Sequence, residues 1–162
     1  MRIAFVPIVL VAAFGAACTT SATPAPAPRT TEACTISAVR HDDLSGVIGG
    51  FNHDTGNLWM GDPSFAAVLF YARNGNPDMP AGGTWPGGHA AKILWWVADA
   101  SASLVVQGHD TTGRRFSQTF DGQGGQYATI VTVPRPGCWT LDAAVAGRHV
   151  GSITVHVVPP TA

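Results

Sequence analysis

Residues 137–158, with the sequence GCWTLDAAVAGRHVGSITVHVV, contain the pattern that decides the fold. In the first half of this stretch, Trp139, Leu141 and Ala143 alternate with polar residues. In the second half, every second residue over 153–157 is apolar. Such a period of two gives each strand one face in the core and one in water. A short Ala-Gly turn joins the halves, so we predict an antiparallel β-hairpin.

The rest of the chain after Cys34 has the same character. Gly, Pro and Asn turns separate nine strand-like segments, which are Thr35–Val39, Gly56–Met60, Ala66–Ala72, Lys92–Val97, Ser103–Gly108, Phe116–Phe120, Gln126–Val133, Gly137–Ala144 and His149–Val158. About nine short strands in roughly 125 residues are typical of an immunoglobulin-like antiparallel β-sandwich. We therefore predict an all-β domain of that kind over residues 34–160.

Composition narrows the class of protein. The 162 residues include 19 Gly and 12 Pro, which favour turns and short strands over long helices. Only 12% of the residues are charged and the formal net charge is −1, which argues against nucleic acid as a partner.

The first residues have the pattern of a secretory signal. An apolar run over residues 3–14 follows Met1-Arg2, and it is shorter than the roughly 20 residues that a membrane-spanning helix needs. Gly15-Ala16-Ala17-Cys18 resembles a bacterial lipobox, in which the cysteine thiol takes a diacylglycerol group and becomes the mature N-terminus. We predict a signal peptide over 1–17 and a lipid anchor at Cys18, which would hold the protein on the outer side of a bacterial membrane. Gly15 departs from the usual large aliphatic residue, so plain secretion is the alternative.

Residues 18–33 form a Thr/Ala/Pro-rich linker between the predicted anchor and the domain. Alternating prolines favour an extended, semi-rigid chain, which suits a tether. With Cys18 lipidated, Cys34 and Cys138 remain as an even pair in an oxidising compartment. We predict that they form a structural disulfide.

Several segments resemble a group of uncharacterised bacterial lipoproteins. The segments are Pro136-Gly137-Cys138-Trp139-Thr140, the last strand ending Val157-Val158-Pro159, Gly56-Asn57-Leu58-Trp59, Lys92-Ile93-Leu94-Trp95-Trp96 and Leu104–Gly108. The resemblance implies one extracytoplasmic immunoglobulin-like domain with a Gly-Cys-Trp strand near its C-terminus and no established activity. This chain lacks a basic residue directly after Trp96, which puts a ligand shared with that group in doubt.

The adjacent Trp95 and Trp96 must point to opposite faces of a strand. Trp95 shares its face with Ile93 and Val97 and is the better core residue, and Trp59 and Trp139 are also expected in the core. Trp96 and Leu94 would then form an outer apolar patch, of the kind that marks a contact site. The long loop 74–88 brings Trp85, which would either join this patch or cover it.

Three His-Asp dipeptides suggest a second kind of site. His41, His53 and His109 could supply nitrogen ligands to Zn²⁺ or Cu²⁺. Their spacing matches no metal-binding motif, and turn-forming Asp with an exposed His explains each dipeptide equally well. We therefore expect no cofactor, and a metal site remains the alternative.

Hydrolase motifs are absent from the sequence, including Gly-x-Ser-x-Gly and Ser-x-x-Lys. We expect a binding or structural accessory domain of the cell envelope and no catalysis. The expected partners are the membrane, through the lipid, and an envelope protein or a cell-wall polymer.

Overall fold

Strands form nearly all the regular structure of the computed structural model, which describes residues 33–41, 44, 57–62, 64–72, 75–98 and 100–161. All of these belong to one unit, Glu32–Ala162. The strands are β1 (Leu58–Asp62), β2 (Phe65–Leu69), β3 (Met79–Pro80), β4 (Lys92–Val97), β5 (Leu104–Asp110), β6 (Arg115–Phe120), β7 (Gln126–Ile130), β8 (Gly137–Val145) and β9 (Arg148–Val158). A 3₁₀ turn, η2 (Ala81–Gly83), follows β3.

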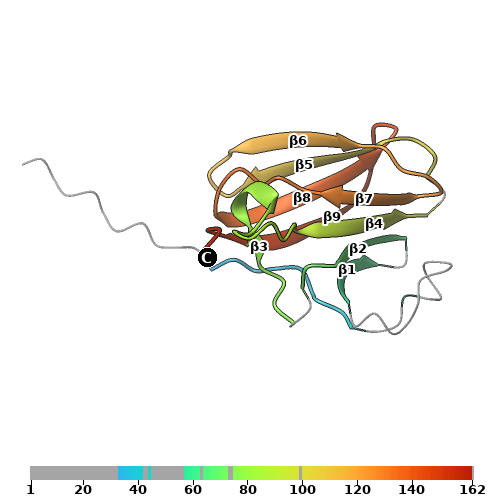
Figure 1. The fold of residues 1–162 in the computed structure, drawn as a ribbon. Coiled ribbons are helices and arrows are strands. Elements are labelled where there is room, and N and C mark those ends of the chain that lie inside the picture. The colour runs from blue at the N-terminus through green and yellow to red at the C-terminus, as the bar shows by residue number, and fades with distance from the viewer. Residues whose placement is uncertain are drawn as a thin grey trace, which may run out of the picture. The chain divides into compact units, whose positions relative to one another are not determined.

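The strands form two facing sheets (Figure 1). A four-stranded sheet has the order β1-β2-β4-β7, and a five-stranded sheet has the order β3-β9-β8-β5-β6. Every pairing is antiparallel except the short parallel contact of β3 with β9. The prediction of an all-β sandwich is confirmed, and its immunoglobulin-like detail stays a prediction.

The main core lies between the sheets and follows the predicted alternation. Trp139, Leu141 and Ala143 of β8 are fully buried, and so are Val155 and Val157 of β9. Each inward side chain removes apolar surface from water, which is the main favourable term in folding.

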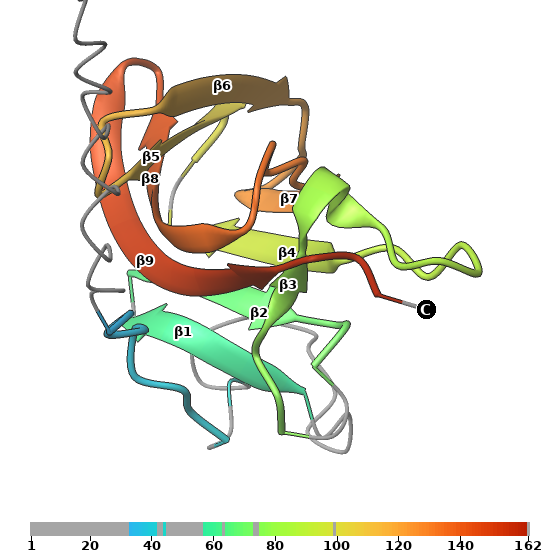
Figure 2. The same ribbon diagram turned by 90° about the vertical axis from the view of Figure 1, so that its left-hand side faces the viewer.

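The strand β9 joins the halves of the sandwich. Figure 2 shows it as a long, strongly curved strand that reaches β3 at its far end, and it contacts β1 and β2 of the other sheet. A shift of register between Ala143 and Ala144 marks the bend. At the bend, a Cβ on Gly151 would stand 2.2 Å from the Phe65 ring, so only glycine allows β9 this close to β2.

The predicted strand over 35–39 is not found. Instead, this segment crosses from one sheet to the other: Ser37 N–H donates to Thr154 O of β9 at 2.9 Å, and Arg40 pairs with Trp59 of β1. The backbone of residues 33–41 pairs with each sheet at a single residue, which is too little to form a ladder with either. We call residues 33–41 the strap, because it closes the side of the sandwich where β9 and β1 meet.

The predicted disulfide between Cys34 and Cys138 is present. It ties the start of the strap to the central strand β8, with a sequence separation of 104 residues. Disulfides persist in oxidising compartments, so the bond agrees with a protein outside the cytoplasm.

Several strand boundaries and one further strand differ from the sequence-based expectations. The strands β1 and β5 extend to Asp62 and Asp110, two residues beyond their expected ends at residues 60 and 108. The strand β2 ends at Leu69 rather than at residue 72, and β7 ends at Ile130 rather than at residue 133. The strand β3 lies inside the region expected to be a loop. A two-residue strand that includes a proline has no alternating pattern and is defined only by its partner β9.

Candidate functional site

The outer face of the four-stranded sheet carries the residues that the sequence singled out. Along β4, Ile93, Trp95 and Val97 point into the main core. Leu94 and Trp96 point the other way, as the alternation predicts. The Trp95 indole N–H donates to Thr129 Oγ1 at 2.9 Å, so the buried tryptophan has its hydrogen-bond partner.

On that outer face lies a second apolar cluster, separate from the main core. We call it the outer aromatic cluster. Its buried members are Leu44, Trp59, Ala66, Val68 and Leu94, and Phe70 and Trp96 pack against them. The outer faces of two-layer sandwiches are normally polar because they meet water. This sheet is therefore apolar on both faces, and all five residues of β2 are buried.

Strand register explains how the cluster forms. Val68 of β2 lies opposite Trp59 of β1 on one side and Leu94 of β4 on the other. One step along, Ala66 lies opposite Trp96. Neighbouring side chains on one face of a sheet are close enough to pack, so three strands contribute to one continuous apolar surface.

The outer aromatic cluster is more deeply buried than the open apolar patch that the sequence predicted. Leu94 is only 9% exposed and Trp59 only 1%, whereas Trp96 is half-buried. Trp59 was expected in the core; it is buried, but in the outer aromatic cluster, because Leu58 and Met60 take the inward positions of β1. Of the two residues predicted on this face of β4, only Trp96 keeps an accessible side chain.

Trp85 does not belong to this cluster, contrary to the predicted grouping with Trp96 and Leu94. It packs against the main core and lies 5.7 Å, between ring centroids, from Tyr71. The reason is local: Trp85 N–H donates to His89 O at 2.9 Å, which folds the segment back on itself. Tyr71 O–H donates to Pro77 O at 3.0 Å, and burial raises the pKa of this phenol.

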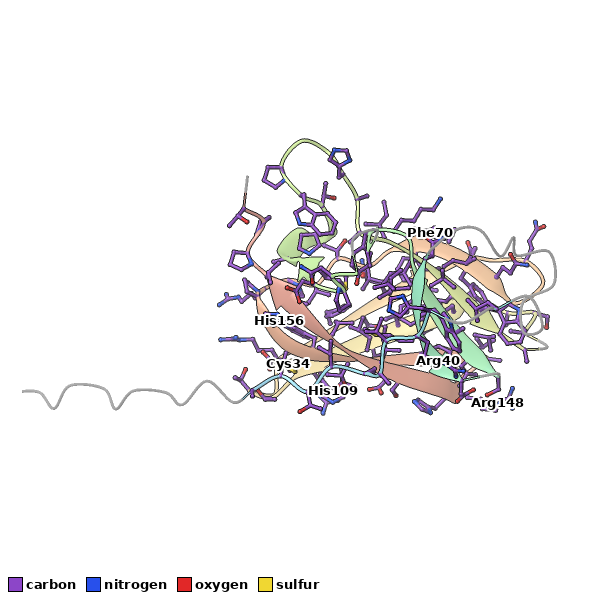
Figure 3. All side chains as sticks on the ribbon, turned by 90° about the horizontal axis from the view of Figure 1, so that it is seen from below. Cys34, Arg40, Phe70, His109, Arg148 and His156 are labelled. Carbon is purple, nitrogen blue, oxygen red and sulfur yellow. A yellow bond between two sulfur atoms is a disulfide. The ribbon has the colours of Figure 1, made fainter. Side chains whose placement is uncertain are left out.

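Two cations border the outer aromatic cluster. The Arg40 guanidinium lies 4.1 Å from the centroid of the Trp59 ring, and the Lys92 ammonium lies 5.8 Å from that of Phe70. Arg40 and Phe70 are labelled in Figure 3, which views the molecule from below relative to Figure 1. Cations over aromatic faces are attracted by the ring quadrupole.

Sequence reasoning missed Ile130, which is 45% exposed and is the one exposed large apolar side chain among the described residues. It lies on β7, opposite Lys92 of β4. Ala128 and Gln126 follow on the same face, opposite Leu94 and Trp96. The alternation of side chains along β7 could have predicted this exposure. Because Tyr127 and Thr129 are buried, Gln126, Ala128 and Ile130 must point outward.

The histidines of the metal hypothesis are placed differently from one another. His41 is exposed at the end of the strap, and His53 lies outside the described residues. His109 Nδ1 lies 3.2 Å from Asp142 Oδ2. In the part of the chain that the structure describes, no three His, Cys, Asp or Glu side chains are arranged to hold a metal ion. A site that uses all three predicted histidines stays a prediction.

Asp142 is the centre of a polar group on the outer face of the five-stranded sheet. Ser152 Oγ donates to Asp142 Oδ1 at 2.6 Å and lies 2.8 Å from His149 Nε2. Gln107 and Asp142 line two adjacent depressions of about 290 and 500 Å³. The carboxylate of Asp142 is thus shared between neighbours on β5 and β9, and its side chain is 35% exposed to solvent.

The acidic member of the third His-Asp dipeptide has a structural role. Asp110 Oδ1 accepts hydrogen bonds from the backbone and hydroxyl of Thr112, at 2.9 and 2.7 Å, and from Arg114 N–H at 2.9 Å. Burial acts to raise the pKa of Asp110, but these hydrogen bonds and the Arg114 charge outweigh it and hold the pKa below its ordinary value. The carboxylate therefore stabilises the turn between β5 and β6.

Other predicted features either lie outside the described residues or have a structural role. Cys18 and the linker belong to the undescribed N-terminal part. Cys138 is held in the disulfide, so it is not available as a thiol nucleophile. Among the described residues, no helix has the length and apolar character needed to cross a bilayer.

Comparison with known proteins adds little to this geometry. No protein-family model and no curated protein matches the chain. A solved structure of a candidate lipoprotein from Bacillus anthracis is similar over 67% of this chain and 82% of that one, at 13% sequence identity and a TM-score of 0.41. A likeness of this size supports no conclusion about function.

Proposed function

We propose that this chain is a non-catalytic binding domain of the bacterial cell envelope. A lipid on Cys18 anchors it, and it contacts a cell-wall polysaccharide through the accessible edge of the outer aromatic cluster, at Trp96. The observation that supports this proposal is the cluster itself. It places aromatic rings on a sheet face that water would normally keep polar.

Trp96 has the surroundings of a sugar-stacking residue. Its ring is half-buried, so packing against Ala66 and its neighbours holds it in place while part of it stays accessible. Opposite it on β7, Gln126 is exposed. A sugar ring presents C–H groups that pack on an aromatic face, and its hydroxyls pair with a neighbouring amide.

Lys92 extends the same surface along β4. Lys92 is an exposed residue, and its ammonium group carries three hydrogen-bond donors. Hydroxyl or acidic groups of a wall polymer would accept these hydrogen bonds. Trp96, Gln126 and Lys92 thus offer one stacking surface with polar groups on its border, which suits a polymer better than a small enclosed ligand.

A polysaccharide fits this surface better than a protein does. Stable protein interfaces bury about 1,200–2,000 Å² around a strongly apolar centre. Here Leu94 and Trp59 are already buried, and Ile130 is the one exposed large apolar side chain among the described residues. A repeating polymer does not need a large contact, because weak contacts at successive units add up.

The proposed anchoring matches this role. The Pro-rich stretch between Cys18 and Cys34 would act as a spacer of about 3.1 Å per residue. Such a spacer would let the domain reach a wall polymer while the lipid stays in the membrane. The disulfide Cys34–Cys138 is compatible with the oxidising compartment that this arrangement requires.

Co-sedimentation with insoluble cell walls tests the proposal. Unit Glu32–Ala162, which has its own core and disulfide, would be mixed with Gram-positive walls, either intact or stripped to peptidoglycan. We expect the wild type to sediment and Trp96→Ala to bind about tenfold more weakly or worse, as for aromatic anchors in other interfaces.

Trp85→Ala is the matched control, because Trp85 is also half-buried but packs against the main core. Gln126→Ala is a second probe at an exposed position, where it leaves the packing intact. Equal loss in the Trp96 and Trp85 variants would indicate destabilisation and contradict the proposed site. No sedimentation of the wild type with either wall preparation would reject the polysaccharide, and capture of one envelope protein by crosslinking would replace it.

A further inference from the structure

The two sheets of the sandwich leave four edge strands, and three of them are protected. The strap covers β1 through the pairing of Arg40 with Trp59. The strand β3 is only two residues long. The strand β6 carries Arg115 and exposes the polar residues Ser117 and Thr119. Short length, charge and cover are the usual means by which proteins keep edges from pairing with other chains.

Among the residues that the structure describes, none gives the fourth edge strand, β7, any of these protections. Its five residues, QYATI, contain no charge and no proline, and its pairing with β4 runs without a bulge. It lies beside β4, on the side away from β2 (Figure 1). The edge is also apolar, because Ile130 is 45% exposed and Ala128 beside it is exposed as well.

The direction of the free backbone groups follows from one hydrogen bond. Val97 N–H donates to Gly125 O at 2.8 Å. Antiparallel ladders alternate, so Tyr127 and Thr129 direct their backbone groups toward β4, whereas Ala128 and Ile130 direct theirs outward.

The open stretch has clear limits. On one side, Gln126 N–H donates to Gln123 O at 3.0 Å. On the other side, Thr132 N–H donates to Gln118 Oε1 at 2.9 Å, and Val133 O accepts from Gly82 N–H at 2.8 Å. The unprotected edge is therefore 127–130.

We propose that two copies of this chain pair through their β7 edges in antiparallel orientation, with the two-fold axis at Thr129. In this register Ala128 forms a hydrogen-bonded pair with the partner's Ile130, and Ile130 forms the same pair with the partner's Ala128. The two four-stranded sheets then become one continuous sheet.

Self-complementarity is the reason to assign this edge to a second copy. In a two-fold dimer the same surface of both copies is in contact, so that surface must be complementary to itself in shape and charge. Here the large exposed Ile130 meets the small Ala128 of the partner, on the same face of the joined sheet. The edge brings no charge into the pairing, so no like charges oppose each other across the axis.

Pairing in this way would also bring two outer aromatic clusters onto one surface. Residue Trp96 of each copy lies on β4, one strand from the shared edge. A polymer that touches both copies would be held more tightly than by one. This gain depends on the proposed function, whereas the pairing itself does not.

Sedimentation equilibrium of unit Glu32–Ala162 from micromolar to millimolar concentration tests the pairing. We expect wild type to shift from monomer to dimer. Ile130→Lys should weaken dimerisation by about tenfold or more, because it places a charge on each side of the axis. Thr119→Lys, an exposed position on β6, is the matched control and should dimerise as wild type does.

Amide hydrogen exchange locates the contact. The Ala128 and Ile130 amides should exchange more slowly at the concentrations where the dimer forms, while those of β6 stay unchanged. A wild type that remains monomeric at millimolar concentration overturns the proposal. So does a dimer that Ile130→Lys leaves intact, or one without slower exchange at Ala128 and Ile130.

Discussion

The outer faces of the two sheets differ in what they present to solvent. The five-stranded sheet follows the ordinary rule: Asp142, Thr140 and Thr154 point outward, and the last two pair at 3.3 Å between hydroxyls. The four-stranded sheet breaks the rule with the outer aromatic cluster. The same kind of ladder underlies both faces, so the difference lies in the side chains. The proposed binding surface rests on this difference, because the accessible edge of the cluster at Trp96 is where the polar rule is broken.

The sharpest test compares one residue from each outer face. Trp59→Ala removes a ring that is 1% exposed, and we expect a loss of about 3–5 kcal/mol in the free energy of unfolding. Thr140→Ala on the polar face should cost about 1 kcal/mol, the value of one hydrogen bond. Urea unfolding measures both. Similar losses would mean that the outer aromatic cluster is no better packed than the polar face.

Breaking the disulfide should have the next largest effect. Cys138 lies on β8 of the five-stranded sheet, and its bond to Cys34 holds the start of the strap. The end of the strap pairs with Trp59 of the four-stranded sheet. Replacing both cysteines by serine should lower the free energy of unfolding by about 2–5 kcal/mol, because the closed loop is long.

Oxidised and reduced wild type provide the control for this pair of substitutions. If reduction alone changes stability as much as the substitutions do, the covalent link is responsible. A double variant as stable as the oxidised wild type would contradict the role assigned to the strap.

The Asp110 turn, which joins two strands of the polar-faced sheet, should respond to pH. Because the folded protein holds the pKa of Asp110 below its ordinary value of 3.8, the carboxylate stabilises the fold above that value. The contribution is lost as the pH falls through the lower, folded-state pKa. Asp110→Asn should therefore cost about 1–2 kcal/mol at neutral pH and progressively less in acid.

Unfolding curves of wild type and Asp110→Asn across the acid range measure this difference. Thr111→Val, at an exposed neighbouring position, is the control and should leave the pH dependence unchanged. A gap between wild type and Asp110→Asn that stays constant down to strongly acidic pH would exclude the carboxylate as its source.

The smallest expected effect is at the border of the outer aromatic cluster. Lys92→Gln removes the cation that lies 5.8 Å from the Phe70 ring and should cost no more than about 1 kcal/mol. Thermal unfolding should show a change of a few degrees at most. A larger loss would show that Lys92 supports the packing of the sheet and does not serve mainly as a surface charge.

The sequence predicted the parts of the fold that depend on local pattern. The alternation in β8 and β9 identified their inward faces, and the same reasoning separated Trp95 from Trp96. The cysteine count also predicted the right disulfide. Each of these inferences needs only the neighbours in the chain or the parity of cysteines.

The site was predicted less well, for reasons that involve distant residues. Trp96 and Leu94 were placed on the correct face, but Leu94 is buried because β2 and Leu44 contribute to the same cluster. Trp85 was grouped with them because the length of a loop does not predict over which face of the sheet it folds. Its contact with Tyr71 places Trp85 against the main core instead. The exposure of Ile130 also depends on strand order, which makes β7 an edge.

By itself, the sequence determined which side chains share a face, because a strand's period of two is a property of the backbone. It also determined the strands of the final hairpin and the pairing of Cys34 with Cys138. Only the tertiary structure decided which strands lie side by side, and therefore that Trp59 belongs outside the main core, that the strap crosses between sheets, and that β7 is open. These outcomes depend on contacts between residues far apart in the chain, for which local alternation contains no signal.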